Sequence, residues 1–206
     1  MSDTRADQVR HGLHLEYFTI AYNSLEALIA IVFGIVAGSV ALVGFGLDSV
    51  IEVTSGATLI WRLRADSSIT ARERAERTAL RIVGVCFFAL AVYVTYEAAE
   101  SLWLQKAPER TVPGIALAVA SMVVMPLLAR AKRRVAGRIE SSALTADAMQ
   151  TELCMYLSAI LLGGLLLNAL LGWWWADPVA ALAMTPIMVK EGRSALRGET
   201  CCESCH

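Results

Sequence analysis

Two acidic residues, Asp48 and Glu52, lie inside an apolar stretch long enough to cross a membrane. Four residues apart on a helix, their side chains leave the same face, one turn from each other. A charged side chain at the centre of a membrane helix costs roughly 2.5–3.5 kcal/mol on insertion scales, so two on one face imply a polar partner or a bound ion inside the bundle. This pair is the candidate functional site.

The composition indicates that membrane helices must position the pair. The chain has 206 residues, of which 56% are hydrophobic, and this is too apolar for a soluble domain of that length. Apolar stretches of about 17–25 residues fit a hydrocarbon core about 30 Å thick. We predict an all-α membrane protein whose six transmembrane helices cover roughly residues 17–37, 39–63, 82–103, 112–129, 144–171 and 173–189. Only Gly38 and Ser39 separate the first two, which predicts a tight hairpin.

The basic residues predict the orientation. Lys and Arg concentrate before the first helix, between the second and third, between the fourth and fifth, and after the sixth. The positive-inside rule then places both termini in the cytoplasm. We expect a cytoplasmic segment over residues 1–16, a six-helix domain over 17–196 and a cytoplasmic tail over 197–206. The first residues do not have the pattern of a cleaved signal peptide. We expect a multi-pass integral membrane protein of a bacterial inner (plasma) membrane.

A short internal repeat points to a second polar pair. The sequence SVAL at residues 39–42 resembles SSAL at residues 141–144, an offset of 102 residues. The same offset carries the two acids of the second helix onto Gln150 and Cys154 of the fifth. If these helices face each other, two carboxylates, an amide and a thiol could converge as the four ligands of a tetrahedral metal site. This donor set favours Zn2+, while Cd2+, Cu and Hg2+ stay open because the thiol suits softer ions.

These motifs resemble those of the cation diffusion facilitator family of divalent-metal transporters. The segment ALTADAMQTELC at residues 143–154 resembles the family's A-L-x-A-D-x-x-H-x-x-x-D motif, and WADPVAA at residues 175–181 resembles its D-P-x-x-A turn. The acidic pair resembles its D-x-x-x-D motif in the second helix, and the similarity covers about residues 16–196. The resemblance implies export of a divalent metal ion from the cytoplasm by alternating access, with protons moving the opposite way and no prosthetic group. The positions that match its metal ligands are Asp48, Glu52, Gln150 and Cys154.

Two departures from the family pattern matter. Gln150 and Cys154 stand where the family has His and Asp, so an amide and a thiol replace an imidazole and a carboxylate. The family usually continues into a cytoplasmic domain, whereas here about a dozen polar residues follow the sixth helix, so we expect any homodimer to form through the membrane helices. The alternative function is a metal-responsive membrane protein that does not transport. The sequence has no activated nucleophile and no phosphate-binding glycine loop, so we expect neither an enzyme nor a nucleic-acid partner.

Other polar residues in the helices extend the candidate site. In the first helix, Asn23 and Glu26 share a face, and Glu26 could be an extra ligand or a proton carrier, or could face water near the cytoplasmic end. In the fifth, Asp147 lies one turn before Gln150 and could bind metal or hold two helices together. Glu152 points away from that face, which favours a water-facing position or an ion pair with a basic residue.

The C-terminal tail contains a separate cluster of metal-binding residue types. Three thiols and one imidazole lie within six residues, namely Cys201, Cys202, Cys205 and His206. Such ligands on a free tail match soft metal ions, which predicts metal capture or delivery. A reactive tail without metal is the alternative, and covalent haem attachment through C-x-x-C-H would require an exported tail.

Overall fold

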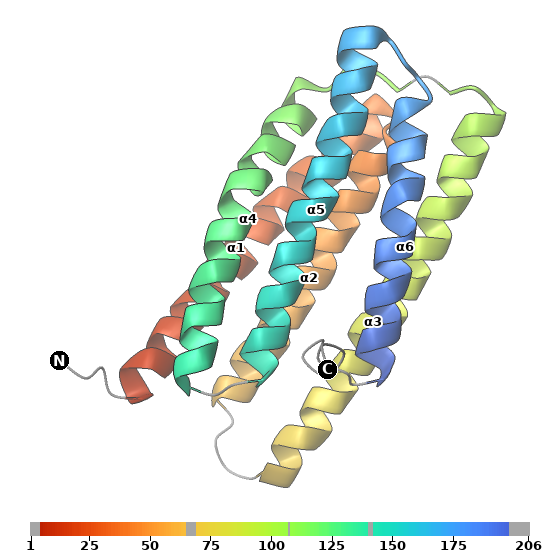
Figure 1. The fold of residues 1–206 in the computed structure, drawn as a ribbon. Coiled ribbons are helices and arrows are strands. Elements are labelled where there is room, and N and C mark those ends of the chain that lie inside the picture. The colour runs from red at the N-terminus through yellow and green to blue at the C-terminus, as the bar shows by residue number, and fades with distance from the viewer. Residues whose placement is uncertain (1–4, 65–68, 107, 140–141, 198–206) are drawn as a thin grey trace, which may run out of the picture.

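The structure, a computed structural model, is a bundle of six long antiparallel helices (Figure 1). It describes residues 5–64, 69–106, 108–139 and 142–197. The predicted all-α fold is confirmed in these residues. The helices are α1 (Arg5–Ala37), α2 (Val40–Arg64), α3 (Ile69–Trp103), α4 (Val112–Ile139), α5 (Ser142–Leu171) and α6 (Ala176–Arg197).

Five of the described helices, α1 to α5, are long and apolar enough to cross a membrane. Helix α6, predicted as the sixth span, is less apolar and packs along α3 (Figure 1). The two backbones nearly touch there, because a Cβ atom on Gly84 would lie 2.9 Å from the carbonyl oxygen of Gly192. Small residues at this crossing therefore allow α6 to join the bundle, as they do between other membrane helices.

Two segments that we interpreted as basic connections are largely helical. Helix α3 already begins at Ile69 and α4 continues to Ile139, so most of the arginines expected in loops extend helices beyond the predicted spans. Arg, Lys, Ala and Glu are good helix formers, so a membrane helix can continue into the polar region without a break. Residues 5–16, expected to form a separate segment, are likewise the start of α1.

The predicted hairpin between α1 and α2 is confirmed. Gly38 has a φ of +65°, a left-handed conformation that glycine adopts without strain. Ser39 then caps α2, because its hydroxyl accepts a hydrogen bond of 3.1 Å from the backbone N–H of Leu42. The same hydroxyl donates to the carboxylate of Asp177 on α6, which also accepts a 3.4 Å bond from the N–H of Ala41. A side chain of α6 therefore completes the cap of α2 and holds the two helices together.

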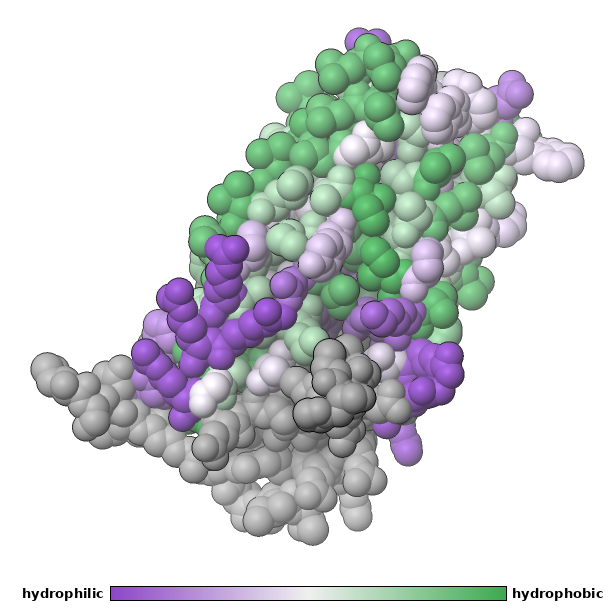
Figure 2. Space-filling view, viewed as in Figure 1, coloured by the Kyte–Doolittle hydropathy of each residue, from purple (hydrophilic) through white to green (hydrophobic). Residues whose placement is uncertain are grey.

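The surface separates apolar from polar residues along the bundle axis. Figure 2 shows hydrophobic residues over most of this face and hydrophilic residues gathered toward the end where α4 ends and α5 begins. Exposed arginines there include Arg130, Arg133 and Arg134. The start of α1 and the end of α6 lie at this same end (Figure 1). This arrangement is consistent with the prediction that both termini lie on one side of the membrane, and the choice of side stays a prediction.

Candidate functional site

Helix α2 carries the acidic pair into the middle of the bundle. It contacts α1, α3, α5 and α6. Asp48 and Glu52 are 5% and 1% exposed, so the helical spacing places both on the inner face, as expected for membrane carboxylates. Two buried acids on the most enclosed helix form the centre of the candidate site.

Glu52 has one oxygen bound and one oxygen free. Its Oε1 accepts a 2.8 Å hydrogen bond from the hydroxyl of Thr151 on α5. Its Oε2 is buried and has no hydrogen-bond partner among the described residues. The buried thiol of Cys154, a weak donor, lies within hydrogen-bonding reach of the Glu52 carboxylate and also interacts electrostatically with Asp48. A buried carboxylate oxygen without a donor is costly, so Glu52 Oε2 is a position where a cation would lower the free energy.

The second and fifth helices pack against each other, which was the condition for their polar pairs to meet, and they run in opposite directions (Figure 1). Contacts of Ser55 with Asp147 and of Glu52 with Thr151 set the antiparallel register. In an antiparallel pair, residues nearer the start of α2 lie beside residues nearer the end of α5. This register brings Cys154 to the level of Asp48. The offset alone could not establish this pairing, because a repeat relates positions in the sequence and not neighbours in space.

Glu26 on α1 joins the site from the other side. It is 1% exposed, so the alternative that it faces water is wrong. Ser49 donates a 2.9 Å hydrogen bond to its Oε2, and Ser121 on α4 donates to its Oε1. Tyr22 lies 3.1 Å from the Ser121 hydroxyl, and it is the donor of that pair whenever the serine hydrogen points to Glu26. Both oxygens of Glu26 are therefore already satisfied by the protein, in contrast to Glu52.

Two amide side chains near the site keep unused polar atoms. Asn23 on α1 is fully buried, and neither its amide oxygen nor its amide nitrogen has a partner among the described residues. The amide nitrogen of Gln150 is also buried without a described partner. Native proteins satisfy most buried polar atoms, so these amide groups are candidates to bind a water molecule or an ion.

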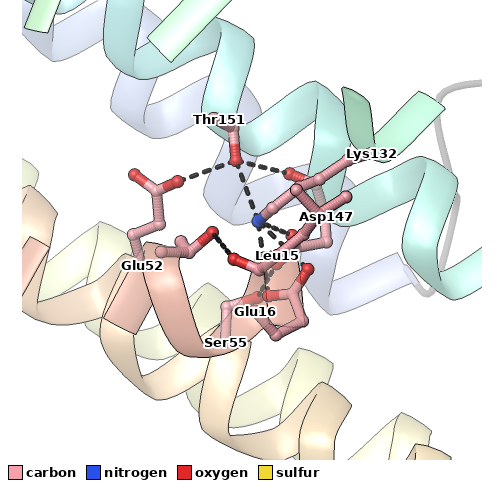
Figure 3. A network of polar contacts seen from close by, with 8 residues as sticks. Leu15, Glu16, Glu52, Ser55, Lys132, Asp147 and Thr151 are labelled. Atoms are coloured by element: carbon pink, nitrogen blue, oxygen red, sulfur yellow. Dashed lines mark hydrogen bonds and ion pairs between the residues drawn. The ribbon is translucent and has the colours of Figure 1, made fainter. Parts of the chain in front are cut away.

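A buried lysine organises the polar residues next to Glu52 (Figure 3). The ammonium nitrogen of Lys132 on α4 lies 3.2 Å from Oε1 of Glu16 and 3.3 Å from the hydroxyl of Thr151. It also donates a short hydrogen bond to Asp147, whose other oxygen accepts a 3.3 Å bond from Ser55. The network thus joins α1, α2, α4 and α5. Here Asp147 acts as the helix-joining residue, one of the two roles that the sequence left open.

Sequence reasoning missed Lys132, Glu16 and Thr151. Lys132 was assigned to a basic cytoplasmic connection, and this was wrong because its side chain is 0% exposed. A signal was present in the helical periodicity. Lys132 follows the inward-facing stripe of α4, whose buried residues include Met125, Leu128, Ala129, Val135 and Ala136. A lysine on such a stripe indicates a buried ion pair and not a solvated loop.

The other predicted residues have different outcomes. Glu152 forms an ion pair with Arg133, which confirms the expected basic partner, although that partner belongs to α4 and not to a loop. The tail cysteines and His206 lie outside the described residues. In the part of the chain that the structure describes, no three His, Cys, Asp or Glu side chains stand close enough to hold one metal ion. The four-ligand cage of Asp48, Glu52, Gln150 and Cys154 therefore stays a prediction.

Comparison with known proteins adds independent information. Residues 17–199 match the family of cation efflux transmembrane domains. An uncharacterized transporter of Synechocystis sp. is 28% identical over 168 residues, which are 79% of this chain and 54% of that protein. Transmembrane protein 163 of Xenopus laevis is 26% identical over 138 residues, 67% of this chain and 49% of its own length. The chain thus spans about half the length of these curated relatives.

Proposed function

The chain belongs to the family of cation efflux transmembrane domains, and from this membership we propose that it transports a divalent transition-metal ion out of the cytoplasm. The observation that carries the proposal is Glu52 Oε2, which is buried beside Asp48 and Cys154 and accepts no hydrogen bond from a described N–H or O–H group. A passing cation would supply the missing partner. Asp48, Glu52 and Cys154 are all buried, so the site does not suit binding of a partner at the protein surface.

We assign the cargo site to side chains of α2 and α5. Asp48 and Glu52 supply carboxylate oxygens, Cys154 a thiolate and Gln150 its amide oxygen. These ligands would close around the ion as it enters, since the described residues do not form a cage without it. The mixed donor set favours Zn2+, with Cd2+, Cu and Hg2+ as softer alternatives.

Exchange against protons follows from the same buried oxygens. Carboxylates enclosed in hydrocarbon need either a proton or a metal ion to balance their charge, so the two cargoes exclude each other. Glu26 suits the role of a proton carrier more than that of a ligand, because serine hydroxyls already bind both of its oxygens. Asn23, one turn away on α1, has free amide atoms and could take the position of an extra ligand or hold water.

Transport requires a sealed membrane, so the test uses the full chain in lipid vesicles with a Zn2+-sensitive dye inside. We expect Zn2+ flux in the wild type and none in Glu52→Gln, which removes the charge and keeps the shape. Glu100→Gln is the matched control, because Glu100 forms a partly exposed ion pair with Lys106 near the end of α3. Zn2+ binding without flux in the wild type would instead support the metal-responsive protein that does not transport.

Two further parts of the proposal concern the setting of the transporter. From the distribution of basic residues we propose that both termini lie in the cytoplasm. The proposed membrane is a bacterial inner membrane, and a homodimer would form through the membrane helices. Large apolar side chains exposed along α1, including Leu28, Ile35 and Val36, suit contact with lipid or with a second copy. Protease accessibility of tagged termini in oriented membrane vesicles tests the orientation of the termini. Cross-linking in the membrane tests the homodimer.

A further inference from the structure

Lys132 is a cation built permanently into the bundle beside the cargo site. Its ammonium group has three N–H donors, and three side chains accept hydrogen bonds from it: Glu16 through Oε2 at 3.3 Å, Asp147 through Oδ2, and Thr151 through its hydroxyl oxygen (Figure 3). Glu16 and Lys132 are both fully buried, so water does not compete for these contacts. The ammonium is therefore held in one position and can in turn fix the groups that it touches.

The contact with Thr151 determines where the threonine hydroxyl points. A hydroxyl has one hydrogen to donate, while Lys132 can only donate. At 3.3 Å from the lysine nitrogen, the Thr151 oxygen acts as the acceptor, and its own hydrogen must go elsewhere. Two acceptors are in reach, Oε1 of Glu52 at 2.8 Å and the backbone carbonyl of Asp147 at 3.2 Å. The shorter bond to a carboxylate is the stronger one.

Without Lys132, the preference of the Thr151 hydroxyl for donating to Glu52 would be weaker. Threonine in a helix commonly donates to the carbonyl four residues earlier, which here is that of Asp147. Lys132 donates to the Thr151 oxygen, and the hydroxyl hydrogen is then directed toward Glu52 on α2. Glu52 Oε1 is thereby occupied, and Oε2 is left as the free oxygen of the carboxylate.

We propose that Lys132 and Thr151 are positioning residues of the cargo site: Lys132 orients the Thr151 hydroxyl, which holds Glu52 with Oε2 free for the metal ion. The inference rests on the proposed function, since it concerns the same site. Neither residue touches the ion. Groups that orient a metal ligand in this way typically affect metal affinity by roughly 10–100-fold.

Lys132 could also weaken metal binding, through electrostatic repulsion, and this effect has a predictable direction. A fixed positive charge near the site repels a divalent cation, so its removal should tighten binding if repulsion were its main effect. Positioning predicts weaker binding when the lysine is removed. The direction of the change in Zn2+ affinity therefore distinguishes the two roles.

The first experiment tests the threonine. Zn2+ dissociation constants are measured by chelator competition on the full chain in lipid nanodiscs, for wild type, Thr151→Val and Thr151→Ser. We expect roughly 10-fold or more weaker binding for valine, which has nearly the shape of threonine but no hydroxyl, and near wild-type binding for serine, which keeps it. Equal affinities of the valine and wild-type proteins would overturn the proposal.

The second experiment tests whether the lysine acts through the threonine. Lys132→Gln is combined with Thr151→Val in a double-mutant cycle whose readout is the Zn2+ dissociation constant. We expect weaker binding for Lys132→Gln alone and no additional loss when valine already replaces the threonine. Tighter binding for Lys132→Gln, or an undiminished loss in the valine background, contradicts the proposal. If Lys132→Gln does not give a monodisperse protein, the net-charge-preserving pair Lys132→Gln with Glu16→Gln takes its place in the cycle.

The wild-type measurement separates the two levels of inference. Absence of Zn2+ binding and flux in the wild type would defeat the proposed function. Binding and flux in the wild type, together with unchanged affinity in these variants, would defeat only the positioning role.

Discussion

Thr151 on α5 and Glu52 on α2 are joined by a 2.8 Å hydrogen bond deep inside the bundle. The bond connects two polar systems that are separate in the sequence, the acidic pair of α2 and the ion-pair network around Lys132. It also leaves Glu52 asymmetric, because one oxygen accepts a hydroxyl hydrogen bond and the other has no described N–H or O–H donor. At the candidate site, the protein therefore holds Oε1 of Glu52 by a hydrogen bond and leaves Oε2 available to a cation.

Replacement of Asp48 by Ala should abolish Zn2+ binding at this site and reduce vesicle flux to background. The reason is that the variant leaves Glu52 as the only carboxylate of the α2 pair, and one carboxylate balances a divalent ion poorly. Val50→Ala is the control, since Val50 is an exposed residue of the same helix. Wild-type flux in the Asp48 variant would show that the site is elsewhere.

Replacement of Cys154 by Asp should keep transport and change the order of preferred metals. A carboxylate is a harder ligand than a thiolate, so the preference should move from Cd2+ toward Zn2+ and harder ions. Competition among Zn2+, Cd2+ and Mn2+ in the flux assay measures the order. An unchanged order would mean that Cys154 does not bind the transported ion.

Replacement of Glu26 by Gln should separate proton coupling from metal binding. The amide keeps the shape of the side chain and one acceptor oxygen for the hydroxyls of Ser49 and Ser121, but it cannot carry a proton across the membrane. We expect a Zn2+ dissociation constant within a few-fold of wild type and a flux that no longer responds to an imposed pH gradient. A loss of affinity as large as that of Glu52→Gln would make Glu26 a ligand.

Two neighbouring glycines on α5 should respond differently to alanine. A Cβ atom at Gly164 would lie 2.6 Å from the Cβ atom of Ala180 on α6, whereas Gly163 has no atom within 4 Å of that position. Overpacking of this kind costs about 1–3 kcal/mol, so Gly164→Ala should lower the thermal unfolding midpoint. Gly163→Ala should be neutral or stabilise the helix by up to about 1 kcal/mol. Equal midpoints for the two variants would contradict the close packing of α5 on α6.

Deletion of residues 201–206 should raise the metal concentration needed for half-maximal flux without lowering the maximal rate. The sequence predicts that the tail captures metal on the cytoplasmic side, where it raises the local concentration at the entrance. Thiols must lose protons to bind metal, so the benefit of the tail should decrease as the pH falls. Loss of flux at saturating Zn2+ would place the tail in the translocation site itself.

The sequence by itself determined the elements and the general chemistry. Apolar stretches of membrane length are local properties of the chain, and so is the Gly38–Ser39 hairpin, whose left-handed glycine and serine cap need only neighbouring residues. The two acids of α2 were identified for the same reason, because a carboxylate in an apolar helix is anomalous whatever surrounds it.

Only the tertiary structure decided which polar groups meet. Lys132 and Glu16 are 116 residues apart, and although the periodicity of α4 puts the lysine on the inward stripe, no local feature tells which acceptors it meets. Its burial depends on α1 and α5, which supply its acceptors, on the register of α4 against α5, and on the antiparallel pairing of α2 with α5. Those contacts are long-range consequences of packing, and they turn an apparent loop residue into the cation that organises the site.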